Sequence, residues 1–228
     1  MALWETVVVL LCVITMTSAC SCMPAHPQEH FCQAQFVIRG KVISGPVQVL
    51  PDNYFVSSNV LGRFLAERVY TFRITKTYKG AAAIKKTDSL KVYGSRGRSV
   101  ITKIYTPSKL NSCRVDLDVG KVYVIAGYIG RKKLSISGCS LRMEWEKITK
   151  KQRSGFARKY GRSCECVHQK CYKDCGKESQ EMACNFEISR NPANECRDRY
   201  GYCQLSSDGR SCSWTTNALY RKCMKKIP

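Results

Sequence analysis

The sequence predicts a mainly β protein, in which a small closed barrel of five strands with flanking helices is followed by a compact domain held by disulfides. Three observations lead to this prediction. Short segments rich in Val, Ile, Tyr and Thr alternate apolar with polar residues over the first two thirds of the chain, as strands do. Fifteen cysteines are distributed unevenly, and nine of them fall between Cys164 and Cys223. Two segments with helix-start signals flank the strands.

The first 19 residues have the pattern of a secretory signal peptide. An apolar run from Val7 to Ile14 is followed by small residues at positions 17–19, where a signal peptidase reads the chain. Glu5 and the absence of Lys and Arg make the start of this leader unusual. The run is shorter than the roughly 18 to 20 residues that a membrane span needs, and no later segment approaches that length. We expect cleavage after Ala19, so that the mature chain begins at Cys20.

The cysteine count supports this cleavage site. Cys12 lies in the leader, and its removal leaves fourteen cysteines, an even number that can pair completely. Such a density in a secreted chain indicates seven disulfides rather than buried thiols. The change in density near Cys164 predicts a first domain at residues 20–164 and a cysteine-rich domain at residues 165–228. The cluster at residues 164–175 resembles a zinc knuckle, but an oxidising compartment favours disulfides over metal binding.

Local patterns place the secondary structure of the first domain. The five predicted strands cover residues 36–44, 68–80, 89–95, 121–129 and 132–138. One helix is expected at residues 26–35, with proline near its start and Glu29 in its first turn. A second is expected at residues 149–160, opening on Thr149 and ending before Gly161. Residues 46–62 are predicted to form a long loop, of a length that is often functional.

The chain is strongly basic. Its formal net charge is +21, which rises by one unit when Glu5 leaves with the leader, and the charge is spread over the whole length. A basic surface of this size attracts polyanions. For a secreted chain we expect sulfated glycosaminoglycans or acidic protein surfaces as partners rather than nucleic acid. The sequence has no Asn-x-Ser/Thr acceptor for N-glycosylation.

Few side chains in the sequence could support catalysis. His26 and His30 are four residues apart on a predicted helix, as zinc ligands often are, but the H-E-x-x-H pattern and an evident third ligand are absent. Helix capping or a surface position is therefore favoured over a metal site. We find no nucleophile elbow, no phosphate-binding loop and no free cysteine beside a histidine. The sequence predicts neither an enzyme nor a cofactor of its own.

The most informative chemistry is the amino terminus that signal cleavage would create. An α-amino group has a pKa of about 7.7 to 8.0, so that a useful fraction is neutral at physiological pH. Together with the carbonyl oxygen of the same residue, its nitrogen forms a five-membered chelate around a metal ion. Disulfides at Cys20 and Cys22 would hold this chelator in one direction. It could then occupy the open fourth position of a catalytic zinc in another protein.

Several motifs together resemble the tissue inhibitors of metalloproteinases. They are CSCMPAHPQEHFC at residues 20–32, IYTPSKLNSC at 104–113, LDVGKVYVIAG at 117–127, CEC at 164–166 and SDGRSCSW at 207–214. The resemblance covers essentially the whole mature chain. It implies an oligonucleotide-binding-type barrel of the netrin-like class for the first domain. It also implies a secreted protein of the extracellular space or matrix that inhibits secreted or cell-surface zinc metalloproteinases.

The same resemblance implies a role for individual residues. The amino nitrogen and carbonyl oxygen of Cys20 would bind the catalytic zinc of the protease, and Ser21 would enter the adjacent primed-side pocket. The next residues would run along the cleft, and the loop before Cys113 would lie beside them. The protease contacts implied in this way are Cys20, Ser21, Cys22, Met23, Pro24, Lys109, Leu110, Asn111 and Ser112.

Disulfide pairs are also implied by the resemblance. They are Cys20–Cys113, Cys22–Cys139, Cys32–Cys164, Cys166–Cys212, Cys171–Cys175, Cys184–Cys203 and Cys196–Cys223. The last pair is additional to the vertebrate-type pattern, so that the C-terminal pattern is invertebrate-like. The sequence alone leaves the pairing of the second domain ambiguous.

Two other readings of the sequence stay open. Netrin-like modules also occur in matrix proteins, where they bind matrix or glycosaminoglycan without inhibiting proteases, and they do not need a cysteine as the first residue. Bacterial lipoproteins begin on cysteine after small residues, but Thr17 stands where their signal requires an aliphatic residue. Acylation of Cys20 would also leave an odd number of cysteines.

Overall fold

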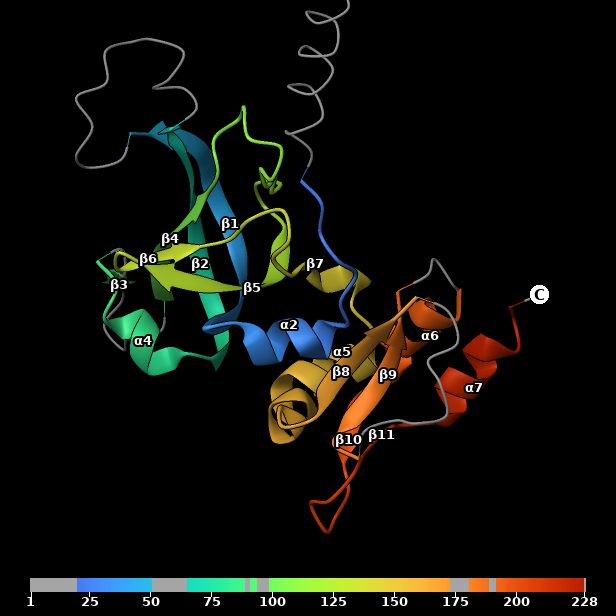
Figure 1. The fold of residues 1–228 in the computed structure, drawn as a ribbon. Helices are drawn as coiled ribbons and strands as arrows, with labels where there is room; N and C mark the ends of the chain where they lie inside the picture. Colours follow the sequence, from blue (N-terminus) through green and yellow to red (C-terminus); the bar gives the residue numbers. More distant parts are fainter. Residues whose placement is uncertain are drawn as a thin grey trace, which may run out of the picture.

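The computed structural model describes residues 20–50, 65–88, 91–93, 99–172, 181–188 and 192–227. The predicted leader, most of the predicted loop at 46–62 and Cys175 lie outside the described residues. The strands are β1 (Phe36–Val49), β2 (Glu67–Lys79), β3 (Lys91–Tyr93), β4 (Ser99–Thr106), β5 (Val122–Gly130), β6 (Lys133–Ser135), β7 (Arg142–Glu144), β8 (Val167–Cys171), β9 (Ala183–Glu187), β10 (Cys203–Leu205) and β11 (Cys212–Trp214). The helices are α2 (Pro27–Gln33), α4 (Ala81–Lys85), α5 (Lys150–Ser154), α6 (Pro192–Tyr200) and α7 (Ala218–Met224), with the short helical turns η1 (Trp145–Lys147), η2 (Gly155–Lys159) and η3 (Tyr160–Ser163). The predicted mainly β architecture with short helices is confirmed (Figure 1).

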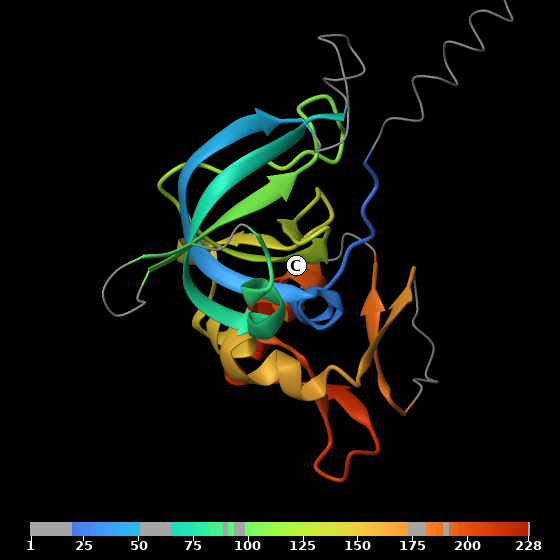
Figure 2. The ribbon, with the colours of Figure 1, turned by 90° about the vertical axis from the view of Figure 1, so that its left-hand side faces the viewer.

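Five strands form a closed ring. Their order is β1, β2, β4, β6 and β5, and the ring closes because β5 pairs with β1. Neighbouring strands are antiparallel except β4 and β6, which are parallel. Figures 1 and 2 show β1 and β2 as long strands that curve around the ring. The interior is filled by apolar side chains that are almost inaccessible to solvent, among them Phe36, Ile38, Phe72, Ile104 and Ile125.

The curvature of β1 depends on irregular pairing with β2. The register shifts several times between Val37 and Val47, and such shifts bend a strand and increase its twist. At Gly40 a Cβ atom would lie 2.2 Å from the carbonyl oxygen of Arg73, so that the close approach requires glycine. Because β1 continues through these irregularities to Val49, the predicted loop does not begin at Pro46.

One strand of the ring was not predicted. This strand is β4, which pairs with β2 on one side and with β6 on the other. The strand predicted at 89–95 corresponds instead to β3, which pairs with β4 and is not part of the ring. In β4, Thr102 and Thr106 are as deeply buried as Ile104. Burial of polar residues together with apolar ones removes the alternation on which strand prediction depends. The short strand β6 also ends at Ser135 rather than at Gly138.

The two predicted helices begin where their capping residues indicate. His26 is the N-cap of α2, and Thr149 forms a capping box with Gln152 at the start of α5. The second helical segment does not end before Gly161 but continues through η2 and η3 to Ser163. Packing explains the extension, because Tyr160 is buried against Phe31 of α2. Within the described ranges, no helix has the length and apolar composition needed to cross a bilayer.

In its described residues, the C-terminal part contains two small sheets and two helices. Strands β8 and β9 pair in parallel, and β10 and β11 pair antiparallel. Its small core consists of buried disulfide sulfurs with Leu205 and Trp214 packed against them. The bridges found here are Cys166–Cys212, Cys184–Cys203 and Cys196–Cys223, which are pairs that the resemblance implied. Cys171 is also disulfide-bonded.

Candidate functional site

The segment that would begin the mature chain is extended and exposed. Residues 20–26 have no regular secondary structure and run past the ring to the start of α2 (Figure 1). Ser21, Cys22, Met23 and Pro24 are exposed, and the side chain of Met23 is 57% accessible. The backbone of this segment is therefore available to a partner.

Two disulfides attach this exposed segment to the ring. Cys20 is bonded to Cys113 and Cys22 to Cys139, with Cα–Cα distances of 5.0 and 5.3 Å. The Sγ atom of Cys20 lies 3.8 Å from that of Cys22 and 3.9 Å from that of Cys139, so the two bridges pack against each other. Although these sulfurs are grouped closely enough to surround a metal ion, all of them are in disulfides and offer no thiolate.

Gly138 allows the two bridges to approach each other. Its amide donates a hydrogen bond of 2.7 Å to the carbonyl oxygen of Cys113. A Cβ atom at this position would lie 3.2 Å from the backbone of Cys113 and 3.3 Å from the Sγ atom of Cys20. Any side chain here would push against the anchor of the first residue. Gly138 has no role in the contacts that the sequence predicts, although its position directly before Cys139 marks it in the sequence.

The loop before Cys113 lies next to the exposed segment. Residues 109–112 are all exposed, and the disulfide of Cys113 to Cys20 holds them near the candidate amino terminus. The Oδ1 atom of Asn111 accepts a hydrogen bond of 2.8 Å from the amide of Cys113, which shapes the turn. The structure thus brings together the two groups of residues that the resemblance implied as protease contacts.

Arg68 holds the chain on the other side of Cys113. Its guanidinium is buried and donates hydrogen bonds to Asp116 (2.7 Å) and to the carbonyl oxygen of Val115 (3.2 Å). The hydrogen bond from Arg68 lowers the pKa of the Asp116 carboxyl, and burial opposes this effect only partly. Sequence reasoning missed Arg68, because its partners lie far along the chain.

A hollow borders the exposed segment on one side. It is lined by Met23 and Pro24 of the segment and by His30, Leu141 and Arg142 from α2 and the start of β7. Its lining is mixed in polarity, and it is open to solvent. The residues from α2 and β7 were not identified in the sequence as part of the site.

His26, at the end of the exposed segment, is fully buried. Its Nδ1 atom accepts a hydrogen bond of 3.1 Å from the amide of Gln28, which leaves Nε2 to donate to the carbonyl oxygen of Arg197 at 3.3 Å. The predicted capping role is confirmed, but the side chain is not on the surface. With both nitrogens engaged, His26 is not available as a metal ligand.

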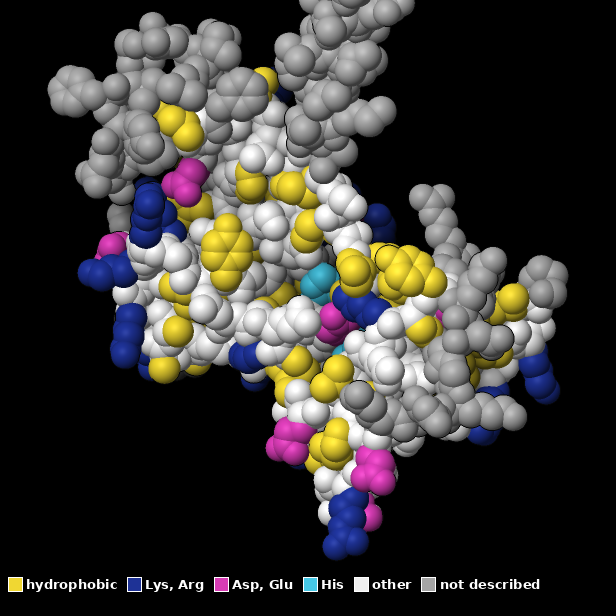
Figure 3. Space-filling model, in the orientation of Figure 1, with side chains coloured by type: hydrophobic (Ala, Val, Ile, Leu, Met, Phe, Trp, Pro, Cys, Tyr) yellow, Lys and Arg dark blue, Asp and Glu magenta, His cyan; other side chains and the backbone are white. Residues whose placement is uncertain are grey.

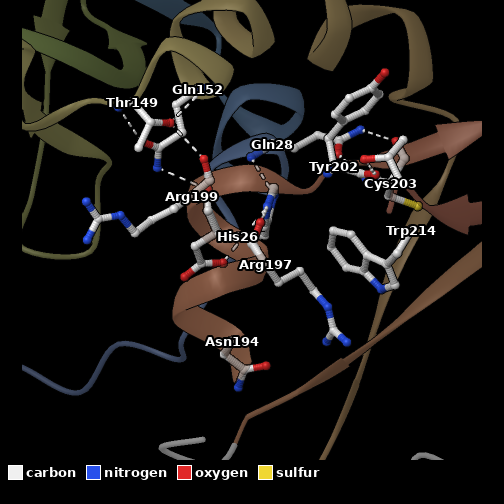
Figure 4. A network of polar contacts seen from close by, with 12 residues as sticks. His26, Gln28, Thr149, Gln152, Asn194, Arg197, Arg199, Tyr202, Cys203 and Trp214 are labelled. Atoms are coloured by element: carbon white, nitrogen blue, oxygen red, sulfur yellow. Dashed lines mark hydrogen bonds and ion pairs between the residues drawn. The ribbon is translucent and has the colours of Figure 1, made fainter. Parts of the chain in front are cut away.

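Aromatic rings and a carboxyl group surround His26. His168 stacks on it at 5.6 Å between ring centroids, and Trp214, which Figure 4 shows beside His26, contacts it edge-on at 5.0 Å. Burial lowers the pKa of His26 to about 3 and that of His168 to about 4. Burial raises the pKa of Asp198 to about 7, and its Oδ1 atom lies 3.9 Å from Nε2 of His26. The contact is therefore not an ion pair near neutral pH, because the imidazole is uncharged.

Acidification is expected to destabilise the protein through this cluster. In the unfolded state both histidines become protonated below about pH 6.5, whereas in the folded state they stay neutral until pH 4 or lower, so acid favours unfolding. Asp198 has the opposite effect. Its carboxyl group is protonated at a higher pH in the folded state than in the unfolded state. The unfolded state thus binds a net excess of one proton near pH 5. The free energy of unfolding should fall with decreasing pH by at most about 1.4 kcal/mol per pH unit.

Urea unfolding between pH 7 and 4.5 measures this slope, and two substitutions change it in opposite directions. His168→Phe retains a ring against His26 and removes one titrating group, so the dependence should become flatter. Asp198→Asn removes the opposing group, so the dependence should become steeper. Parallel curves for the two variants and the unaltered chain would show that the cluster does not titrate in this way.

Comparison with known proteins identifies the family of this chain. The family model described as "Tissue inhibitor of metalloproteinase" matches residues 18–214. A tissue inhibitor of metalloproteinase from Drosophila melanogaster is 28% identical over 90% of this chain and 86% of its own length. Metalloproteinase inhibitor 2 from Homo sapiens is 28% identical over 92% of this chain and 87% of its own, and metalloproteinase inhibitor 3 from Xenopus laevis is 30% identical over 67% and 60%. The family match covers most of the residues, including the exposed segment and its disulfides, and the chain therefore belongs to the tissue inhibitor of metalloproteinase family.

Proposed function

We propose that this protein is a secreted inhibitor of zinc metalloproteinases that binds the catalytic zinc of the protease through the amino nitrogen and carbonyl oxygen of Cys20. The observation that carries the proposal is the pair of disulfides that holds an exposed, extended segment in one direction. Relatives named metalloproteinase inhibitors support the activity in general. Members of this family act on proteases and are not themselves enzymes, so this chain is not an enzyme.

The proposed mechanism uses the backbone rather than the cysteine sulfurs. A catalytic zinc keeps an open position that holds the attacking water, and a bidentate ligand at this position displaces the water. The α-amino group is suited to this role because part of it is neutral at physiological pH. Ser21 would enter the adjacent primed-side pocket, and Met23 and Pro24 would lie along the cleft. Residues 109–112 would contact the protease beside them.

Signal cleavage is an activating step in this proposal. Removal of residues 1–19 creates the free amine of Cys20, and the oxidising extracellular space maintains the disulfides that orient it. We infer that residues 20–164 form a netrin-like barrel of the oligonucleotide-binding type and that residues 165–228 form the second domain. The closed five-strand ring supports the first of these assignments.

Sulfated glycosaminoglycans are a second proposed class of partner. On the outer surface of β1 and β2, the exposed side chain of Lys41 lies opposite that of Arg73. Arg39, which is half-buried and stacks on Trp145, lies opposite the exposed Lys76. Like charges in directly opposite positions destabilise a sheet, and a bound polyanion would remove this repulsion. Figure 3 shows Lys and Arg side chains mainly along the edges of the face that contains the N-terminal segment. This basic surface favours binding to the extracellular matrix. Matrix binding could accompany protease inhibition, or, in the alternative function, the protein would bind the matrix and inhibit no protease.

Titration of a metalloproteinase catalytic domain with the mature chain tests the proposal. Inhibition should be stoichiometric, and acetohydroxamic acid, a small zinc chelator, should compete with the chain, because both occupy the same zinc position. Inhibition that is additive with the chelator would contradict zinc binding. Heparin binding without any inhibition across several metalloproteinases would instead support the matrix module.

A further inference from the structure

Methionine side chains differ widely in their exposure to solvent. Removal of the predicted leader would leave four of the six methionines, at positions 23, 143, 182 and 224, and the structure describes all four. Met143 packs against the buried cluster that contains Val124, and Met182 and Met224 are half-buried. Met23 is 57% accessible. Among these four thioethers, that of Met23 is therefore the most open to small reagents in solution.

The chain on either side of Met23 keeps this side chain at the surface. Cys22, directly before it, is bonded to Cys139 beside the ring. Pro24, directly after it, disfavours the helical conformation for Met23 and leaves the extended one. Residues 20–26 accordingly contain no helix and no strand. The thioether is thus presented to solvent on a backbone that has little freedom to fold over it.

Met23 also borders the hollow beside the exposed segment. Met23, Pro24 and the nearly buried Leu141 supply apolar surface to its lining, and His30 and Arg142 supply polar surface. In the proposed complex the segment lies along the cleft of the protease, so the Met23 side chain would be removed from water there. A flexible, apolar thioether adapts readily to such a contact.

No thiol competes with this thioether for an oxidant in the part of the chain that the structure describes. Each cysteine there is disulfide-bonded, and none offers the thiolate that oxidants attack first. An oxidant in solution would therefore meet the exposed Met23 before the half-buried methionines.

We propose that Met23 is a modification site, at which oxidation to the sulfoxide by a peroxide weakens inhibition. The sulfur lone pair of Met23 attacks one peroxide oxygen, an S–O bond forms and the O–O bond breaks. The sulfur is oxidised by two electrons, and the other oxygen of hydrogen peroxide leaves as water after it takes up the proton of the transferred oxygen. The inference rests on the proposed function, because it concerns the segment that would enter the active-site cleft.

The sulfoxide would change the contact with the protease and leave the fold intact. Oxidation turns an apolar side chain into a polar one that accepts hydrogen bonds. Burial of the new oxygen without a donor opposite it costs free energy that burial of the thioether does not. Met23 lies outside the three buried clusters of the described residues. The inhibition constant should therefore rise at least about tenfold, while the unfolding temperature stays the same.

Mild treatment of the mature chain with hydrogen peroxide, stopped with catalase, tests this inference. Peptide mass mapping should show the gain of one oxygen atom at Met23 before any gain at the other methionines. Inhibition of a metalloproteinase catalytic domain should weaken in proportion to the fraction oxidised at Met23. Methionine sulfoxide reductases for both epimers, supplied with a dithiol, should remove the oxygen as water and restore inhibition. Removal of the oxygen without recovery of inhibition would contradict the proposal.

Two variants separate Met23 from other targets of peroxide, and each is compared with itself before treatment. Met23→Leu cannot form a sulfoxide at this position, so peroxide should leave its inhibition constant unchanged. Met224→Leu is the matched control, since it removes a methionine of α7 and should lose inhibition on treatment as the unaltered chain does. Undiminished inhibition by chains oxidised at Met23, or an equal loss in Met23→Leu, would overturn the inference. Absence of inhibition by the untreated, unaltered chain would overturn the proposed function instead.

Discussion

A mature chain with one alanine added before Cys20 is expected to bind a target metalloproteinase at least about 1000-fold more weakly than the unextended chain, a difference of roughly 4 kcal/mol. The added residue converts the α-amino group into a peptide nitrogen, whose lone pair is delocalised into the carbonyl group and is a poor donor to zinc. It also places an extra residue where the catalytic metal would lie. Acetylation of Cys20 should have the same effect, because an amide is again formed.

Steady-state inhibition assays on chains of verified mass measure this effect. The control is a chain with one alanine added after Pro228, at the opposite end of the sequence. Both extended chains should contain the same disulfides as the unextended chain and unfold at the same temperature, since Cys20 is only half-buried and its bridge to Cys113 is retained. Equal potency of all three chains would falsify the chelation mechanism while leaving the fold and the family unaffected.

Removal of the Cys22–Cys139 disulfide, by replacement of both cysteines with alanine, is expected to weaken inhibition about 100-fold. This bridge closes a long loop, with a sequence separation of 117, so its loss should also lower the free energy of unfolding by about 4 kcal/mol. The larger consequence concerns the exposed segment, which would stay attached only through the Cys20 bridge and the buried side chain of His26. Its backbone would sample more directions and would lose more entropy on binding.

The Cys32–Cys164 disulfide provides a matched control. Its sequence separation of 132 is similar, so replacement of this pair with alanine should cost a similar free energy of unfolding. It joins the C-terminal end of α2 to Cys164, directly after η3, and this end of α2 lies away from the exposed segment. In the variant, Lys79 would still hold the C-terminal end of α2 by its hydrogen bond to the carbonyl oxygen of Cys32. The unfolding temperature should therefore fall by a similar amount in both double variants. Inhibition should be weakened mainly in the variant that lacks the Cys22–Cys139 disulfide. Equal losses of inhibition would mean that the Cys22 bridge acts only through global stability.

Features that depend on neighbouring residues were predictable from the sequence. The start of α5 follows from the capping box of Thr149 and Gln152, which are three positions apart. Strands β2 and β5 were placed nearly correctly, because both are continuous runs rich in β-branched and aromatic residues. Strand β4 was missed, since Thr102 and Thr106 are buried inside the fold and hide the alternation of apolar and polar residues. Closure of the ring through β1 and β5 likewise has no local signal.

The candidate site divides in the same way. By itself the sequence determined the family, through motifs such as that at residues 20–32, and it predicted that the mature chain begins at Cys20. Only the tertiary structure decided that Gly138 packs under the first disulfide and that Trp214 and Cys203 close over the start of α2. Capping and strand patterns are carried by residues a few positions apart, whereas these contacts join residues more than one hundred positions apart, whose approach depends on the fold as a whole.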